Sequence, residues 1–282
     1  MNIHFDNKEA FEELKRVSVL SIKIGSWMYG TNDENSDSDI LYIYVPSYEE
    51  MNSMASSHHQ FQYKEDGIDH IFVDIYNFLK NSLNGDSTIN FEVINHPSLV
   101  GTELEFLYNM RHSFSNHKII RSYLGMARRD VKHISNGSTD RDKNKKLNHV
   151  LRGYYFCEQI LVNGFNPIIP KGSAFHNKIE ENKLITDSRD RHRIGKDLLE
   201  KVSELREKVN TKLDDGTLGF PQYMRDCDMA LLDLILTDKV SEWRSDFGEP
   251  TYFSYIKSII YDAIANDIKY EKNGEVKNYK VN

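Results

Sequence analysis

Hydrophobic positions along the first hundred residues predict a small sheet with flanking helices. Residues 7–16 repeat apolar side chains at helical spacing, which indicates a short amphipathic helix. Four later stretches are rich in β-branched or aromatic residues and end at polar turns, so we expect strands there. These strands cover residues 17–24, 40–45, 61–64 and 68–73. From Asp74 the apolar spacing is again helical, and this helix should end at Asn84-Gly85-Asp86.

Beyond residue 100 the strand pattern nearly disappears and long helical patterns replace it. The expected helices cover residues 114–135, 143–163, 188–213 and 221–244. The stretch 251–268 is ambiguous, and the polar residues 269–282 are expected to be loosely ordered or an edge hairpin. The pattern as a whole predicts an α+β protein with two domains, residues 1–100 around a mixed sheet and residues 101–282 built from helices.

The composition is typical of a globular protein with a hydrophobic core. Of the 282 residues, 39% are hydrophobic and 28% are charged, which argues against a disordered chain. No apolar stretch approaches the roughly 20 residues that span a bilayer, so we expect no membrane association. The first residues lack the basic and apolar regions of a signal peptide. Two cysteines, Cys157 and Cys227, are too few for a disulfide framework or a structural zinc site, so a cytoplasmic location is expected.

Charge is distributed unevenly along this acidic chain. The formal net charge is −7, yet residues 118–152 contain ten Lys and Arg residues and only three acidic ones. This segment therefore carries +7 and the remainder −14. A basic segment in an acidic chain is a candidate for contact with phosphate groups. The alternative is an ordinary solvated helix face, which would have the same composition.

The residues best suited to chemistry lie between the first two expected strands. Gly25 and Ser26 follow the first strand, where a glycine lets a phosphate approach the backbone and a helix start attracts anions. Asp37 and Asp39 precede the second strand, and at strand spacing both carboxylates project from one face. Two adjacent carboxylates are stabilised by a cation, and Mg²⁺ or Mn²⁺ would bridge them to substrate phosphates.

A third carboxylate is expected from a neighbouring strand. Asp69 lies inside a strand pattern and suits that position. Asp74 lies at the junction between a strand and a helix, where the simpler role is a helix cap. We favour Asp69 and keep Asp74 as the alternative.

These residues resemble the active-site signature of the DNA polymerase β-like nucleotidyltransferase superfamily. The similarity comprises Gly25-Ser26, Tyr29-Gly30-Thr31 and Ser36-Asp37-x-Asp39. A narrower group is also similar, the predicted nucleotidyltransferases associated with RNA repair in bacteria and their phages. The matching residues there are Asp69, Phe78-Leu79-Lys80, Asn84-Gly85, Glu92, Lys146, His149, Arg152 and Glu158-x-x-Leu161-x-x-Gly164. The chain departs from this group at Asp86-Ser87, where Asn-Pro is usual.

The resemblance implies a minimal polymerase-β-like mixed sheet with flanking helices and a helical domain across a cleft. It implies the transfer of an NMP from an NTP to a hydroxyl group, with Mg²⁺ or Mn²⁺ as cofactor. The implied catalytic and metal-binding residues are Asp37, Asp39 and Asp69. The implied nucleotide-binding residues are Gly25, Ser26, Lys145, Lys146 and Arg152.

The acceptor is the open question at this point. The basic segment 118–152 and the narrower resemblance suggest the 3′ end of an RNA of about tRNA size. One alternative is transfer of AMP to a protein or a small molecule. The other is a nucleotide-binding scaffold without catalytic activity.

Overall fold

A five-stranded mixed sheet forms the N-terminal half of the protein. The computed structural model describes residues 2–4, 8–34, 36–46, 60–114, 117–134, 139–162, 165–214, 238–243 and 245–246. The strands are β1 (Asn2–His4), β2 (Ser18–Ile24), β3 (Asp39–Tyr44), β4 (Gln60–Glu65) and β5 (Ile68–Asp74), in the order β1-β4-β5-β3-β2. β3 is parallel to β5 and antiparallel to β2, and β4 is antiparallel to β5 and parallel to β1. The four predicted strands and the mixed sheet are confirmed, whereas β1 was not predicted.

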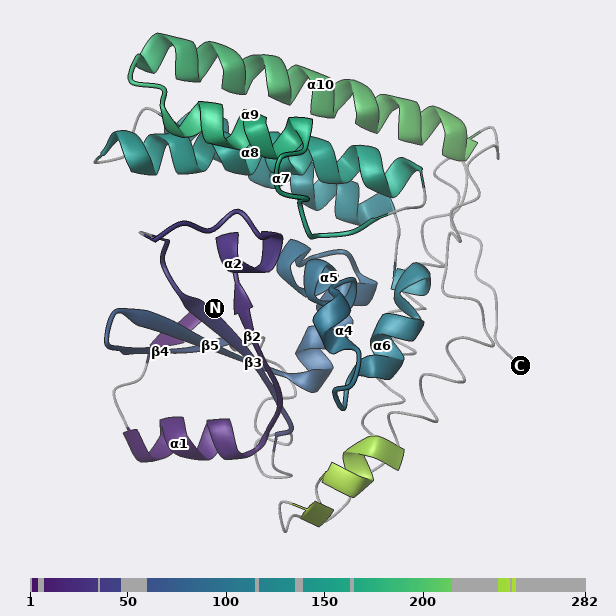
Figure 1. Ribbon diagram of the computed structural model, residues 1–282. Coiled ribbons are helices and arrows are strands. Elements are labelled where there is room, and N and C mark those ends of the chain that lie inside the picture. The colour runs from purple at the N-terminus through teal and green to yellow at the C-terminus, as the bar shows by residue number, and fades with distance from the viewer. Residues whose placement is uncertain are drawn as a thin grey trace.

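The alternation of side chains along β3 explains why the sheet is covered on both faces. Leu41 and Ile43 belong to a large hydrophobic core, whereas Tyr42 and Tyr44 belong to a smaller one. Helix α1 (Lys8–Arg16) covers the smaller core through the fully buried ring of Phe11. In Figure 1, α1 lies on one side of the sheet and the long helices lie on the other. Successive strand residues point to opposite faces of the sheet, so alternate residues of β3 pack into different cores.

The large core is covered by helices from the rest of the chain. They are α2 (Ser26–Tyr29), α4 (Ile75–Leu83), α5 (Thr88–Ile94), α6 (Glu105–Asn109), α7 (His117–His133), α8 (Asp140–Leu161), α9 (Ala174–Lys183) and α10 (Ser188–Asp214), with short 3₁₀ turns at Pro97–Leu99 and Arg111–Phe114. The predicted helices before residue 214 are confirmed, and α9 was not predicted. Of the predicted helix 221–244, only 238–243 is described, and it is helical. The expectations for 251–268 and 269–282 lie outside the described residues.

The hydrophobic core runs without interruption from the sheet into the helical half. Its buried members include Ile43 of β3, Phe78 of α4, Tyr123 of α7 and Phe156 of α8. This core crosses the predicted domain boundary near residue 100, and the boundary itself stays a prediction. Within the part of the chain that the structure describes, no helix has both the length and the apolar character that crossing a bilayer requires.

Candidate active site

The ends of three strands meet at one position of the sheet. In the sheet register, Ile24 of β2 lies opposite Asp39 of β3, and Asp39 in turn lies opposite Asp69 of β5. The Gly25-Ser26 turn follows Ile24 directly. The turn and the two acids are therefore immediate neighbours, since adjacent strands are about 4.8 Å apart.

Asp39 and Asp69 project from the face of the sheet that the helical half covers. Asp39 has the same parity along β3 as Leu41 and Ile43, which belong to the large core. Along β5, Asp69 has the same parity as Val73 of that core. Since alternate strand residues share a face, both carboxylates are directed toward the side on which α7, α8 and α10 lie (Figure 1).

The two acids of the Asp37-x-Asp39 motif have opposite electrostatic surroundings. The Lys145 Nζ atom of α8 is 2.7 Å from the Asp37 Oδ2 atom, and this hydrogen bond and charge lower the pKa of Asp37. Burial raises the pKa of Asp39, and the negative charges of Asp69 and Asp37 raise it further. Of the two acids of the motif, Asp39 is thus the one that a neighbouring cation would stabilise more.

The carboxylates have the donor chemistry that a divalent magnesium or manganese ion requires. Among the described residues, no three His, Cys, Asp or Glu side chains converge as ligands of a metal ion. Asp37 instead contacts Lys145, and Asp69 contacts Lys64, whose Nζ atom is 3.4 Å from its Oδ1 atom. Both lysines supply positive charge to a cluster of carboxylates that repel one another. The all-oxygen donor set and this repulsion fit Mg²⁺ or Mn²⁺.

The Gly25-Ser26 turn leaves open space beside its backbone. Gly25 has a φ of +69°, and a Cβ atom placed there would meet no atom within 4 Å. A side chain would therefore be strained and would fill space that a phosphate could occupy. Two later segments of the chain contact the short helix α2 that follows. His96 Nε2 lies 3.2 Å from the Met28 carbonyl oxygen, and the Ile169 amide donates to the Tyr29 carbonyl oxygen at 2.9 Å.

A buried polar cluster contacts α2 through Tyr29, the last residue of that helix. The hydroxyl groups of Tyr29 and Tyr123 donate to the Glu92 carboxylate at 2.6 and 2.8 Å. The Arg152 guanidinium carbon lies 4.0 Å from the centre of the Tyr29 ring. Burial raises the pKa of Glu92, and the positive charge of Arg152 opposes that rise. Glu92 and Arg152 therefore act together on the helix that carries the Gly25-Ser26 turn.

Comparison with known protein families decides the identity of the chain. A sequence model of the RNA repair pathway DNA polymerase beta family (RlaP) matches residues 4–237, which include strands β2 to β5 and the helices through α10. The chain belongs to this family. The protein is thus a polymerase-β-like nucleotidyltransferase with an RNA repair association, as the motifs suggested. No curated protein and no solved structure matches the chain.

The structure distinguishes the two neighbouring lysines that the motif implicated in this nucleotidyltransferase. Lys145 reaches Asp37, whereas the Lys146 ammonium donates to the His133 carbonyl oxygen at the end of α7, at 3.0 Å. Lys146 is therefore not brought to the carboxylates. Adjacent residues of a helix point about 100° apart, so only one of the two can face the acids.

The structure also adds two lysines that sequence reasoning missed. Lys183 of α9 contacts the Asp33 carboxylate at 3.0 Å and the Thr31 carbonyl oxygen at 3.4 Å, in the loop before Asp37. No local signal marks it, because α9 itself was not predicted. Lys64 pairs with Asp69 across the β4–β5 hairpin, a neighbour that the position of the turn could have indicated.

Asp74 has the surroundings of a structural residue. Its Oδ1 atom accepts a hydrogen bond from the Asn77 amide at 2.8 Å, which caps α4. Its side chain is buried, and burial raises the pKa of the carboxyl. Asp74 therefore caps α4, and Asp69 is the acid that lies beside Asp39.

Proposed function

We propose that this nucleotidyltransferase transfers an NMP from an NTP to the 3′ hydroxyl group of an RNA, in a metal-dependent reaction. The observation that carries the proposal is the register of Asp39 beside Asp69, next to the open Gly25-Ser26 turn. In the reaction the acceptor oxygen forms a bond to the α-phosphorus and loses its proton. The bond to the β-phosphate breaks, and pyrophosphate leaves.

Each nearby side chain has a role in that proposal. Asp37 and Asp39 would hold the metal ions, and Asp69 would complete the site beside the acceptor hydroxyl. Bound Mg²⁺ or Mn²⁺ would lower the pKa of that hydroxyl and offset negative charge. The backbone of Gly25 and Ser26 would hold the β- and γ-phosphates, and Lys145 would stabilise the charge of departing pyrophosphate.

The remaining two implicated residues act at a greater distance. Arg152 lies against Tyr29, so its effect on the nucleotide would pass through α2. Lys146 binds the end of α7, so its effect would pass through the position of that helix.

The proposed acceptor rests on exposed cations of the basic segment. Arg121, Arg128 and Lys132 are exposed on α7. They are separated by seven and four residues, so they form one stripe along the helix. Positive side chains in such a row suit the regularly spaced phosphates of an RNA backbone.

Removing two charges from this stripe tests the RNA acceptor. We expect Arg128→Gln with Lys132→Gln to weaken binding of a tRNA transcript and to reduce the salt slope by about two units, one per lost phosphate contact. NTP affinity should stay unchanged. Arg193→Gln on α10 is the control, because it removes an exposed arginine from a different helix.

Arg129 is left unchanged in this test because it forms an ion pair inside the protein. It pairs with the buried Asp130, whose other oxygen lies 3.2 Å from His149 Nδ1. Substituting Arg129 would disturb α8 as well as RNA. If the double variant binds RNA with the affinity and salt slope of the Arg193→Gln control, α7 does not contact the acceptor.

A further inference from the structure

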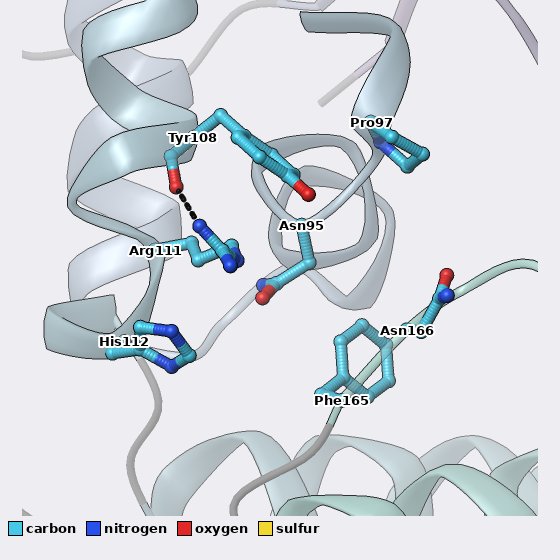
Figure 2. A pocket seen from close by; sticks show the side chains of 7 residues that line it. All are labelled: Asn95, Pro97, Tyr108, Arg111, His112, Phe165 and Asn166. Atoms are coloured by element: carbon cyan, nitrogen blue, oxygen red, sulfur yellow. Dashed lines mark hydrogen bonds between the residues drawn. The ribbon is translucent and has the colours of Figure 1, made fainter. Parts of the chain in front are cut away.

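A cavity opens near the C-terminal end of α5, on the opposite side of α2 from the loop that leads to β3. It has a volume of about 320 Å³ and lies between α5, α6 and the segment that follows α8. Figure 2 shows three of its side chains on one side and three on the other, with Asn95 between them: Tyr108, Arg111 and His112 face Pro97, Phe165 and Asn166. In Figure 1, α5 and α6 lie on the opposite side of α2 from the loop that leads to β3.

The lining has a composition that suits a nucleotide. It contains two aromatic rings, two basic side chains and two amides, and none of its seven residues is acidic. Aromatic rings and guanidinium planes stack on unpaired bases, amides hydrogen-bond to base edges, and basic groups bind phosphate.

Several of these groups are fixed before any ligand binds. The Arg111 guanidinium carbon lies 4.1 Å from the centre of the Tyr108 ring, and its Nη1 atom donates to the Tyr108 carbonyl oxygen at 2.8 Å. Phe165 packs against the ring of Phe91, with centroids 4.7 Å apart. The Asn95 amide donates to the Phe91 carbonyl oxygen at 2.9 Å. A site fixed in this way loses little conformational entropy on binding.

Helix α8 contacts both this cavity and the acidic residues, so its length gives the distance between them. Lys145 of α8 contacts Asp37, and Gln159 of the same helix accepts a hydrogen bond from the Asn166 amide at 2.7 Å. These two residues are 14 positions apart, which corresponds to roughly 21 Å along the helix axis. A stacked strand rises about 3.4 Å per nucleotide. Roughly six nucleotides therefore separate the two sites.

We infer that this cavity binds one unpaired nucleotide of the acceptor RNA, upstream of the 3′ end that is extended. The inference rests on the proposed function, because it requires an RNA strand that starts at the acidic residues. A volume near the lower limit of small-molecule pockets holds one nucleotide and excludes a duplex. The base would stack on Tyr108 or Phe165, and Arg111 would bind the adjoining phosphate.

The test compares a long and a short oligonucleotide. Fluorescein-labelled oligoadenylates of about 12 and about 3 nucleotides have the same 3′ end, but only the longer one spans roughly 21 Å at about 3.4 Å per nucleotide. Tyr108→Leu should weaken binding of the longer RNA about 10-fold, within the range for loss of one stacked base, and leave the shorter one unchanged. Arg111→Gln should weaken the longer RNA and reduce its salt slope by about one unit.

The controls separate failure of this inference from failure of the proposed function. Arg193→Gln removes an exposed arginine elsewhere and should bind both RNAs as the wild type does, and thermal melting confirms that the variants fold. Unchanged binding of the longer RNA by both variants overturns the inference, and so does equal weakening of both RNAs. If the two variants bind AMP more weakly but bind the longer RNA as the wild type does, the cavity is a site for a free nucleotide, and this result also overturns the inference. Transfer of a labelled NMP by the wild type to a tRNA transcript is measured separately, so the proposed function can stand when the inference fails.

Discussion

Asp39→Asn should make the metal-free protein more stable and at the same time inactive. Asp39 lies beside Asp69 across neighbouring parallel strands, which are about 4.8 Å apart. Two unit charges about 5 Å apart repel by about 0.8 kcal/mol in a water-like dielectric and by about 3 kcal/mol at an effective dielectric constant of 20. The Asp69 side chain is 50% exposed, so the lower value applies and we expect a gain of about 1 kcal/mol. For a chain of this size that raises the melting temperature by about 2–4 °C.

The assay combines thermal melting without divalent metal and turnover of a labelled NTP. Asp190→Asn is the matched control, because it removes one exposed carboxylate whose ion pair, among the described residues, is with Arg193 on the same helix. Added Mg²⁺ should raise the melting temperature of the wild type and of the control, and not that of Asp39→Asn, since a ligand stabilises only the form that binds it. A lower melting temperature for Asp39→Asn than for the control, or wild-type turnover, would refute the reasoning.

Further predictions concern the other acids and the core. Asp69→Ala should lower turnover by at least about 100-fold. Asp74→Ala should retain turnover and lose about 1 kcal/mol of stability, because it removes a helix cap. Kinetics and thermal melting of both variants check this, and the reverse pattern would make Asp74 the catalytic acid. Because burial raises the pKa of Asp74, its carboxyl stabilises the fold when protonated and loses that contribution as pH rises above its ordinary value of 3.8. Asp74→Asn keeps a cap and should gain stability relative to the wild type as the pH rises above about 4, the range in which the unfolded carboxyl ionises, in urea titrations; a difference independent of pH would contradict this. Phe156→Ala empties a fully buried position and should lower the free energy of unfolding by about 3–5 kcal/mol, as measured by urea denaturation; a loss below about 1 kcal/mol would contradict this packing.

The strands of the sheet could be predicted because their hydrophobic pattern follows directly from the two cores. From Leu41 to Tyr44, the sequence of β3 places aliphatic and aromatic residues alternately, and they separate to opposite faces. By contrast, β1 has three residues, too few to show any period. Helix α9 was missed because only Ile179 and Asn182 of its residues are buried, which leaves hardly any apolar stripe.

The acids of the candidate site could be predicted from the sequence, but its lysines could be predicted only in part: Lys145 was predicted together with Lys146, which lies elsewhere. Asp37, Asp39 and Asp69 are marked by their positions relative to strands, which the sequence shows. The register that puts Asp39 opposite Asp69 depends on the order of the strands, which local patterns do not contain. Which of two adjacent lysines faces the acids depends on the rotation of α8, which the packing of α7, α9 and α10 determines.

The buried cluster around Glu92 shows the same limit. On sequence grounds Glu92 could either orient a basic group near the site or face water, and the sequence does not distinguish these two interpretations. The structure buries it completely beside Tyr29 and Tyr123, with the charge of Arg152 nearby. Its three partners come from α2, α7 and α8, so only the tertiary fold could distinguish the interpretations.

Transfer of a labelled nucleotide to RNA tests the central claim most directly. The wild-type protein is incubated with Mg²⁺, an NTP labelled at the α-phosphate and a tRNA transcript that ends in either a 3′ hydroxyl or a 3′ phosphate group. We predict that the transcript with the 3′ hydroxyl gains label and one or more nucleotides, that the transcript with the 3′ phosphate gains none, and that Asp39→Asn labels neither. Label that enters a protein or a small molecule in place of RNA, or equal labelling of both transcripts, would contradict the account.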